Sequence, residues 1–391
     1  MRALNADKIN EYTLNQGVKM LEITNLRDGA VLNRHHGIET GEHLEIRIEG
    51  LANPQAEVTV NGAPVKRCDR HFSATVRLTD RVNRITAAAS DYFGEESLTI
   101  TVLWDKKSFR RCHFFFDDCC FFLRDITRQR PKSIFDTMFL GRLKKIHDKY
   151  NSKFLLNLFY TDDHHKDFTL SDMPADYKDE FRANKEWLQL SFHARSEFPD
   201  RPYQHADSET LAADYDLVYN EVCRFAGPEC FMPPLVLHWA MTNPENFQVL
   251  KDRGTRCLSG GYLGCVVSVS EKSHSVAVAD VGYFYEQDVA HWLCDAGPVM
   301  YDRKYDIVLG TGMVCCNYDD ISVLQKKFAE LPPEQEIISL MSHEQYSFPD
   351  YFNYIPDHLD RVEEACRLAH ENNCTPSWFS KGIWGNEYWD K

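Results

Sequence analysis

Hydrophobic and polar residues alternate with a period of two between residues 20 and 104, which predicts β-strands that bury one face. The expected strands are Leu21–Ile23, His43–Ile48, Glu57–Val60, Phe72–Leu78, Asn83–Ala89 and Ser97–Leu103. Asn61-Gly62 follows the third strand and predicts a hairpin, because both residues tolerate a positive φ. Since no convincing helical pattern interrupts these strands, we expect a β-sandwich.

From residue 110 onward, apolar strand-like runs alternate with longer helical stretches. The expected strands are Cys112–Phe116, Phe154–Phe159, Leu188–Phe192, Cys230–Met232, Arg256–Leu258, Ile307–Leu309 and Ile337–Met341. The expected helices are Phe135–Tyr150, Ser208–Phe225, Asn243–Asp252, Ile321–Glu330 and Pro356–Asn372. Buried strands that alternate with helices indicate a parallel α/β sheet or barrel, whose chemistry usually lies at the carboxyl ends of the strands. We therefore expect two domains, residues 1–105 and 106–391.

The amino-acid composition indicates which kinds of binding partner are unfavourable for this protein. The 391 residues include 59 acidic and 44 basic side chains, a net charge of −15, which disfavours nucleic acid and anionic membranes as partners. No apolar run approaches the roughly 18 residues of a membrane-spanning helix. The 13 cysteines form no CxxC pair, and the first residues lack an apolar leader, so we expect reduced thiols in a cytoplasm. A leader removed before this sequence begins would leave the same pattern and an extracytoplasmic protein.

The first candidate site is the strand-end pair Asp117-Asp118, which closes the apolar run that begins at Cys112. Two adjacent carboxylates at the end of a buried strand are costly to solvate, so a metal ion or two separated pKa values would resolve the conflict. The pair then suits a divalent cation plus a general base. The alternative is an N-cap residue with a solvated neighbour.

Three further apolar runs also end in histidine. The run from Leu188 ends at His193, with Glu197 four residues on, and imidazole plus carboxylate suits zinc or another first-row metal. A structural histidine satisfied by hydrogen bonds fits His193 equally well. The other two runs end at His238, beside Trp239, and at His343. Four strand ends that each carry His or Asp are typical of one site assembled from several strands.

This order of motifs resembles the polysaccharide deacetylase (NodB homology, carbohydrate esterase family 4) superfamily over about residues 110–382. The resemblance implies a distorted (β/α) barrel in which a divalent metal activates water to remove acetyl groups from sugars. It further implies that Asp117 is the general base, that Asp118 and His193 are metal ligands and that His343 protonates the leaving group. Glu344 would assist as a second acid or base.

Two departures from the deacetylase pattern concern the remaining ligand. Glu197 stands where a second histidine is usual, and Met232 replaces the usual arginine before proline. We expect His238 to be the third ligand, followed by Glu197 and His205 as alternatives.

Aromatic residues around these motifs are candidates for substrate binding. Trp239 follows His238, and Tyr346 belongs to an aromatic-rich segment that could line a sugar-stacking wall, although ordinary packing is the alternative. The polar loop Asp162-Asp163-His164-His165 would touch substrate only if it folds over the barrel mouth.

The segment from Asn83 to Asp105 resembles the last hairpin of immunoglobulin-like modules attached to bacterial carbohydrate-active enzymes. A spacer or packing domain is the alternative to a sugar-binding role for this module.

Three functions follow from these patterns. The first is a metal-dependent hydrolase that deacetylates a carbohydrate or sugar derivative. The second is a catalytically inactive carbohydrate-binding or assembly protein on the same fold. The third is a metal-dependent lyase or glycosidase that works through Asp117 and Glu344.

Overall fold

The computed structural model describes residues 21–92, 94–260, 282–295 and 299–391. The chain divides into two compact units, Met1–Lys106 and Lys107–Lys391, so the division lies one residue beyond the expected domain end at residue 105. No helix in the described part of the chain is both long and apolar enough to cross a membrane.

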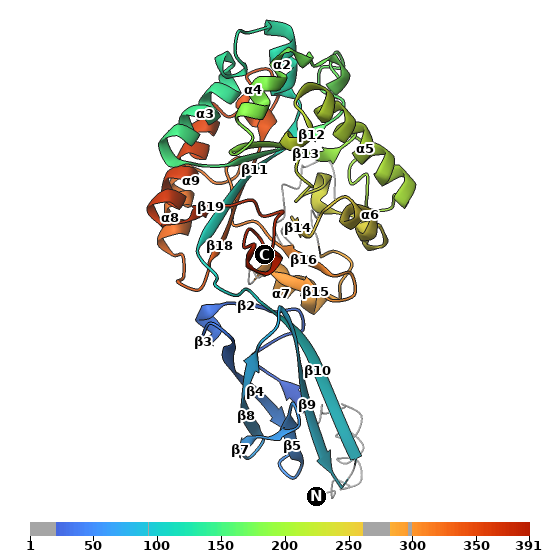
Figure 1. Cartoon of the computed structure of the whole chain (residues 1–391), viewed down its shortest axis with the longest axis vertical. Coiled ribbons are helices and arrows are strands. Elements are labelled where there is room, and N and C mark those ends of the chain that lie inside the picture. The colour runs from blue at the N-terminus through green and yellow to red at the C-terminus, as the bar shows by residue number, and fades with distance from the viewer. Residues whose placement is uncertain (1–20, 93, 261–281, 296–298) are drawn as a thin grey trace, which may run out of the picture. The chain divides into compact units, whose positions relative to one another are not determined.

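Unit 1 consists of two five-stranded sheets (Figure 1). The first contains β1 (Leu21–Ile23), β4 (Leu44–Ala52), β8 (His71–Leu78) and β7 (Lys66–Cys68) in that order, with β3 (Gly37–Glu39) paired to β4. The second has the order β2 (Val31–Leu32), β10 (Gly94–Trp104), β9 (Val82–Asp91), β5 (Glu57–Val60) and β6 (Ala63–Pro64). A short 3-10 helix, η1 (Arg34–His36), precedes β3.

The strand predictions for unit 1 are confirmed, and the alternating pattern has the expected cause. In β4 every second residue from Leu44 to Ala52 is buried, and strand β1 packs against β9 and β10 of the other sheet. The predicted hairpin joins β5 to β6, with Asn61 at φ 50° and Gly62 at φ 77°. The assignment of unit 1 to the immunoglobulin-like class stays a prediction.

Unit 2 contains a six-stranded parallel sheet and a separate three-stranded sheet. The larger sheet has the order β13 (Leu188–Ala194), β12 (Phe154–Phe159), β11 (Arg111–Cys119), β18 (Ile337–His343) and β17 (Val314–Cys315), with β19 (Thr375–Pro376) paired to β11. The smaller sheet has the order β14 (Cys257–Ser259), β16 (Ile307–Gly310) and β15 (Met300–Asp302). These ladders do not close into one ring among the residues that the structure describes, so the barrel remains a prediction.

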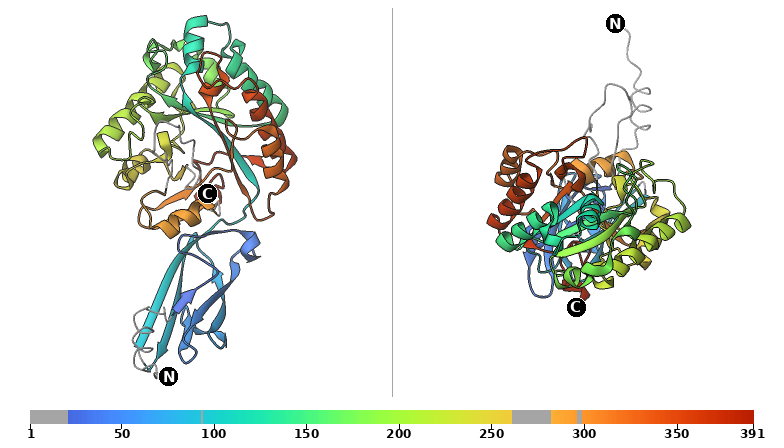
Figure 2. Two further views of the ribbon diagram at one scale, coloured as in Figure 1. Left: turned by 180° about the vertical axis from the view of Figure 1, so that it is seen from behind. Right: turned by 90° about the horizontal axis from the view of Figure 1, so that it is seen from above.

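In projection, helices α3, α8 and α9 lie toward one edge of the larger sheet and α5 and α6 toward the other (Figures 1 and 2). Helices α3 and α5 pack on the same face of this sheet, because Phe116 contacts Phe139 of α3, Phe192 contacts Tyr215 of α5, and the strand register puts Phe116 and Phe192 on one face. The α-helices are α2 (Phe121–Gln129), α3 (Met138–Tyr150), α4 (Lys178–Ala183), α5 (Ser208–Phe225), α6 (Phe247–Asp252), α7 (Gln287–Asp295), α8 (Ile321–Ala329) and α9 (His358–Glu371). The 3-10 helices are η2 (Ile134–Asp136), η3 (Leu170–Asp172), η4 (Ala175–Tyr177), η5 (Pro228–Cys230), η6 (His238–Ala240), η7 (Pro244–Asn246), η8 (Glu344–Ser347) and η9 (Tyr388–Asp390).

One strand prediction is wrong. The segment predicted as the strand Cys230–Met232 forms the end of η5 and a single bridge between Phe231 and Leu190. Pro233 and Pro234 follow, and because proline has no N–H to donate to a ladder, the strand cannot continue. His238, expected at a strand tip, therefore lies in the 3-10 turn η6.

Candidate metal centre

The carboxyl ends of three parallel strands and one turn bring the predicted site residues together. Asp117 and Asp118 lie at the end of β11, His193 near the end of β13 and His343 at the end of β18. His238 begins η6. All five line one cavity of about 270 Å³, so the site combines residues far apart in the sequence.

A β-bulge turns both aspartates toward the cavity. Successive side chains of a regular strand point to opposite faces of the sheet. Here the β11–β12 register shifts between Phe116 and Cys119, and Asp118 has a φ of 59°. A left-handed backbone at an aspartate is uncommon and costs roughly 1–3 kcal/mol, and such sites cluster where function requires an unusual side-chain direction.

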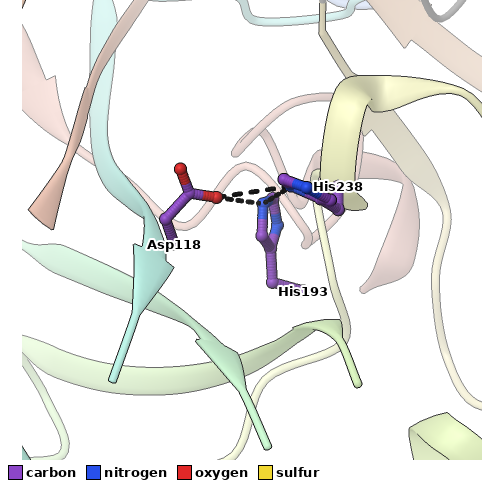
Figure 3. Close-up of side chains that lie close together, drawn as sticks. All are labelled: Asp118, His193 and His238. Carbon is purple, nitrogen blue, oxygen red and sulfur yellow. Dashed lines mark hydrogen bonds and ion pairs between the residues drawn. The ribbon is translucent and has the colours of Figure 1, made fainter. Parts of the chain in front are cut away.

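Asp118, His193 and His238 point toward one another (Figure 3). Oδ1 of Asp118 lies 3.2 Å from Nε2 of His193 and 3.3 Å from Nδ1 of His238. The two histidine nitrogens are 3.3 Å apart. All three residues are buried, and the three atoms form a nearly equilateral triangle.

Each histidine uses its other nitrogen to donate a hydrogen bond to a main-chain carbonyl. Nδ1 of His193 lies 3.3 Å from the oxygen of Val236, and Nε2 of His238 lies 3.0 Å from the oxygen of Glu197. Since carbonyl oxygens only accept, the distant nitrogens carry protons, and in the neutral form of each ring the near nitrogen presents a lone pair to the carboxylate of Asp118. Oδ1 of Asp118 is buried and has no hydrogen-bond partner within the described ranges of the chain.

This arrangement fits a metal ion. Two lone pairs and one carboxylate oxygen that converge without a shared proton repel one another unless a cation lies between them. A tetrahedral zinc ion with bonds of about 2.0–2.1 Å separates its ligand atoms by roughly 3.3–3.4 Å, which agrees with the observed triangle. The ligand set therefore suits a borderline ion such as zinc better than a hard ion that prefers oxygen.

The two aspartates have opposite pKa shifts. Burial alone would raise the pKa of Asp118, but hydrogen bonds from His193 and His238, donated when those rings are protonated, and the charge of His343 hold that pKa well below the ordinary value of 3.8. Burial raises the pKa of Asp117 from 3.8 to about 7, and the charge of Asp118 contributes to this rise. His343 and a hydrogen bond from Nδ2 of Asn157 at 2.7 Å oppose it. A carboxylate with a pKa near neutrality suits a general base.

His343 lies beside Asp118 in the cavity wall. Its Nε2 is 4.0 Å from Oδ2 of Asp118, and its Nδ1 is 3.0 Å from Oδ1 of Asn317. The amide oxygen accepts the Nδ1 proton, so Nε2 is the atom that His343 presents to the cavity. In the β11–β18 ladder Asp117 pairs directly with His343.

Three other candidate site residues, Glu344, His205 and Glu197, do not belong to the triangle. Glu344 is fully buried and does not line the cavity. Its carboxylate accepts hydrogen bonds from the main-chain N–H groups of residues 120–122, at 2.8, 3.0 and 2.5 Å, and so caps helix α2. His205 is exposed. Glu197 lines the cavity, but its carboxylate binds His164 and Gln345 rather than joining the triangle.

Aromatic side chains form part of the cavity wall. Trp239, Tyr318, Tyr346 and Tyr351 all line it. Trp239 has a φ of 63°, and the guanidinium of Arg201 lies 4.5 Å from the centroid of its ring. The structure therefore places both Trp239 and Tyr346, the two residues expected to bind substrate, at the cavity.

Asn157 and Asn317 were not singled out from the sequence. Asn157 is the only polar residue of β12, whose six residues are all buried, so an amide inside an apolar run was an available signal. Asn317 follows the buried pair Cys315-Cys316 in a loop, and no pattern in the sequence connects it to His343.

Comparisons with known proteins give no family. No protein-family model matches the chain, and no curated protein matches it. Similar solved structures include titin domains Z1Z2 in complex with telethonin, with 12% identity, 25% of this chain and 58% of that chain covered, and a TM-score of 0.17. They also include the Bacteroides ovatus GH5 xyloglucanase in complex with a XXXG heptasaccharide, with 10% identity, 59% of each chain covered and a TM-score of 0.21.

A third similar structure is that of a putative α-galactosidase from Bacteroides fragilis, with 8% identity, 90% of this chain and 78% of that chain covered, and a TM-score of 0.27. The chain thus spans 58% and 59% of the first two proteins. These TM-scores are too low to support an inference about fold or activity.

Proposed function

We propose that the chain is a metal-dependent hydrolase that deacetylates a carbohydrate or sugar derivative. Asp118, His193 and His238 would hold a divalent cation, zinc or another first-row metal. The observation that carries this proposal is the triangle of three buried ligand atoms, with separations of 3.2–3.3 Å. When bound, such an ion polarises the substrate carbonyl and lowers the pKa of a water molecule.

Asp117 would take the proton of the attacking water. The water oxygen forms a bond to the acetyl carbon, and the proton moves to the Asp117 carboxylate, whose pKa is raised by burial in the metal-free site and would be lowered by a bound cation. Asn157 holds Oδ1 of Asp117 by a hydrogen bond of 2.7 Å and so fixes the direction of the carboxylate.

His343, in its protonated form, would give the Nε2 proton to the leaving atom. The bond from the acetyl carbon to the sugar nitrogen or oxygen then breaks, and acetate and the free amine or hydroxyl are released. The hydrogen bond to Asn317 orients the imidazole for this transfer, because it keeps Nδ1 away from the cavity.

The aromatic wall supports a sugar as substrate. Sugar rings expose apolar C–H faces that pack on aromatic side chains, while their hydroxyls require polar partners. Trp239 and Tyr346 offer the first surface, and Asp200 and Tyr318 offer the second, around a cavity of about 270 Å³. The net charge of −15 agrees with a neutral or cationic substrate rather than nucleic acid.

The proposed deacetylase activity also leads to a proposal about the fold of each unit. We infer that unit 2 is a distorted (β/α) barrel of the deacetylase type, and that unit 1 is an immunoglobulin-like module of the kind attached to carbohydrate-active enzymes. The parallel strands of unit 2, with their polar side chains at one edge, support the first inference.

The contacts of Glu344 disfavour a glycosidase that works through Asp117 and Glu344. A glycosidase needs two carboxyl groups that face the same bond, and the Glu344 carboxylate is occupied by three N–H donors outside the cavity. A non-catalytic binding protein would not need three converging ligand atoms, so the triangle favours the hydrolase.

The test combines metal content with acetate release. We expect one equivalent of metal per wild-type chain by elemental analysis, and less than about a tenth of that in Asp118→Ala and His193→Ala. His205→Ala, which removes an exposed histidine, serves as the control and should keep the full content. Full metal content in both site variants would refute the site.

Acetate release from a panel of N-acetylated and O-acetylated oligosaccharides tests the reaction separately. Wild-type protein should release acetate, and the two site variants should not. A protein with full metal content that releases no acetate from any member of the panel would refute deacetylation while leaving the metal site standing.

A further inference from the structure

Glu197 occupies the position where the deacetylase pattern has a ligand histidine, four residues after His193, yet its carboxylate does not reach the triangle. Three of its contacts explain what it does instead. Its main-chain oxygen accepts a hydrogen bond from Nε2 of His238 at 3.0 Å. Its Oε2 atom accepts hydrogen bonds from Nε2 of His164 and, at 2.9 Å, from Nε2 of Gln345.

The residues that hold the Glu197 side chain are themselves anchored. The main-chain N–H of His164 donates to Oδ1 of Asp162 at 3.0 Å, and Asp162 is fully buried. Gln345 is 1% exposed and lies in η8, two residues after the end of β18. In the same loop Asp163 accepts a hydrogen bond from the main-chain N–H of Phe198 at 3.1 Å. Glu197 is therefore tied to two segments that are distant from it in the sequence.

His238 needs such support because no strand holds it. It lies in the turn η6, where the following residues Trp239 and Ala240 have φ angles of 63° and 55°. Non-glycine residues with a left-handed backbone conformation are found only where surrounding contacts stabilise that conformation. The other two triangle residues, Asp118 and His193, lie in strands of the six-stranded sheet.

We propose that Glu197 is a positioning residue for the third ligand. Its main-chain carbonyl fixes the proton of His238 on Nε2, and its carboxylate, held by His164 and Gln345, keeps that carbonyl in place. The deacetylase pattern's second histidine is thus replaced by an indirect support, and Nδ1 of His238 becomes the ligand atom. This inference rests on the proposed metal site.

The test measures zinc affinity of metal-free protein by competition with a chromophoric chelator. Residues that orient metal ligands typically contribute about 10–100-fold to affinity. We expect Glu197→Ala to weaken zinc binding at least about tenfold, while Glu197→Gln, which keeps one accepting oxygen, loses less. Gln345→Ala should weaken binding in the wild type but add nothing in the Glu197→Ala background, because both changes act through one carboxylate.

Asp200→Ala is the matched control. Asp200 lines the same cavity, so this variant removes one negative charge near the site and leaves the contacts of Glu197 in place. It should weaken zinc binding less than about threefold. The inference is overturned if Glu197→Ala binds zinc like the wild type, or if Asp200→Ala loses as much affinity as Glu197→Ala.

A second readout separates this inference from the metal proposal. In the metal-free protein, ¹⁵N chemical shifts should show His238 protonated on Nε2 in the wild type and a mixture of tautomers in Glu197→Ala. If the wild type binds no zinc, the proposed function fails, and the shifts still decide the role of Glu197. Identical shifts for His238 in the two proteins would overturn it.

Discussion

His113 of β11 is expected to make unit 2 less stable when the pH falls from 7.5 to 5.0. The residue is 1% exposed, and its Nδ1 accepts a hydrogen bond from the main-chain N–H of Phe379 at 3.2 Å. Burial and, to a smaller extent, Lys153 lower the pKa of His113 from 6.5 to about 3. A proton on Nδ1 would face the N–H donor of Phe379, so the folded protein keeps the ring neutral.

The sign and size of the effect follow from this lowered pKa. Because the unfolded chain binds the proton near pH 6.5, the stability contributed by neutral His113 is present above that pH and is lost as the pH falls toward 3. At pH 5.0 the loss is about 2 kcal/mol, since roughly 1.5 pH units separate this pH from the unfolded pKa at about 1.36 kcal/mol each. Any folded pKa below about 4 gives the same value.

The assay is urea unfolding of the wild type and of His113→Asn at both pH values. Tryptophan fluorescence follows mainly unit 2, because six of the seven tryptophans lie beyond Lys106. Asparagine can still accept from Phe379 but does not titrate. The wild type should therefore lose about 2 kcal/mol more than His113→Asn between pH 7.5 and 5.0.

His205→Asn is the control, because His205 is exposed. It should lose as much stability as the wild type on acidification. Equal losses in His113→Asn and the wild type would refute the reasoning, since His113 would then titrate alike in the folded and unfolded chains.

Three further predictions concern the cavity and its surroundings. Glu344→Ala should destabilise the protein by about 3 kcal/mol or more in urea unfolding, because it leaves three buried N–H groups without an acceptor. Glu344→Gln should keep turnover. Loss of turnover in folded Glu344→Gln would show that Glu344 has a catalytic role. Asn317→Leu should lower kcat at least about tenfold at unchanged KM and metal content, because His343 loses its fixed tautomer; an unchanged kcat would contradict the role of Asn317. Trp239→Ala should raise KM about tenfold, or ~1.4 kcal/mol, with little change in kcat, and an unchanged KM would remove Trp239 from the binding surface.

Local pattern was enough to predict most elements of both units. The burial alternation of β4 and the mainly apolar, fully buried runs of β12 and β13 reflect their places in sheets, so their residues could be assigned to strands without knowing what they pack against. Helix α5 begins after Asp207, whose side chain accepts from the N–H of Thr210 at 2.8 Å, and this cap is also local. Such elements are specified by residues close in the sequence.

Elements that depend on distant residues were missed. The sequence around Cys120 and Phe121 resembles a continued apolar strand, but α2 begins there because Glu344, more than 200 residues away, accepts its first N–H groups. The strand predicted before His238 fails for a local reason, because Pro233 and Pro234 have no N–H to donate to a ladder.

Some features of the candidate site could be predicted from local sequence, and others depend on distant residues. Asp118 and His193 followed from strand ends, and the choice of His238 over Glu197 and His205 agrees with the triangle. The bulge at Asp118 and the contact between Asn317 and His343 were not predictable, because both arise from how separate strands meet.

The most direct test of the metal centre is a crystal of the protein soaked in zinc and measured at wavelengths on either side of the zinc absorption edge. We expect an anomalous peak within about 2.0–2.2 Å of Oδ1 of Asp118, Nε2 of His193 and Nδ1 of His238. No peak at that position, with the three side chains directed to separate partners, would contradict the proposed centre.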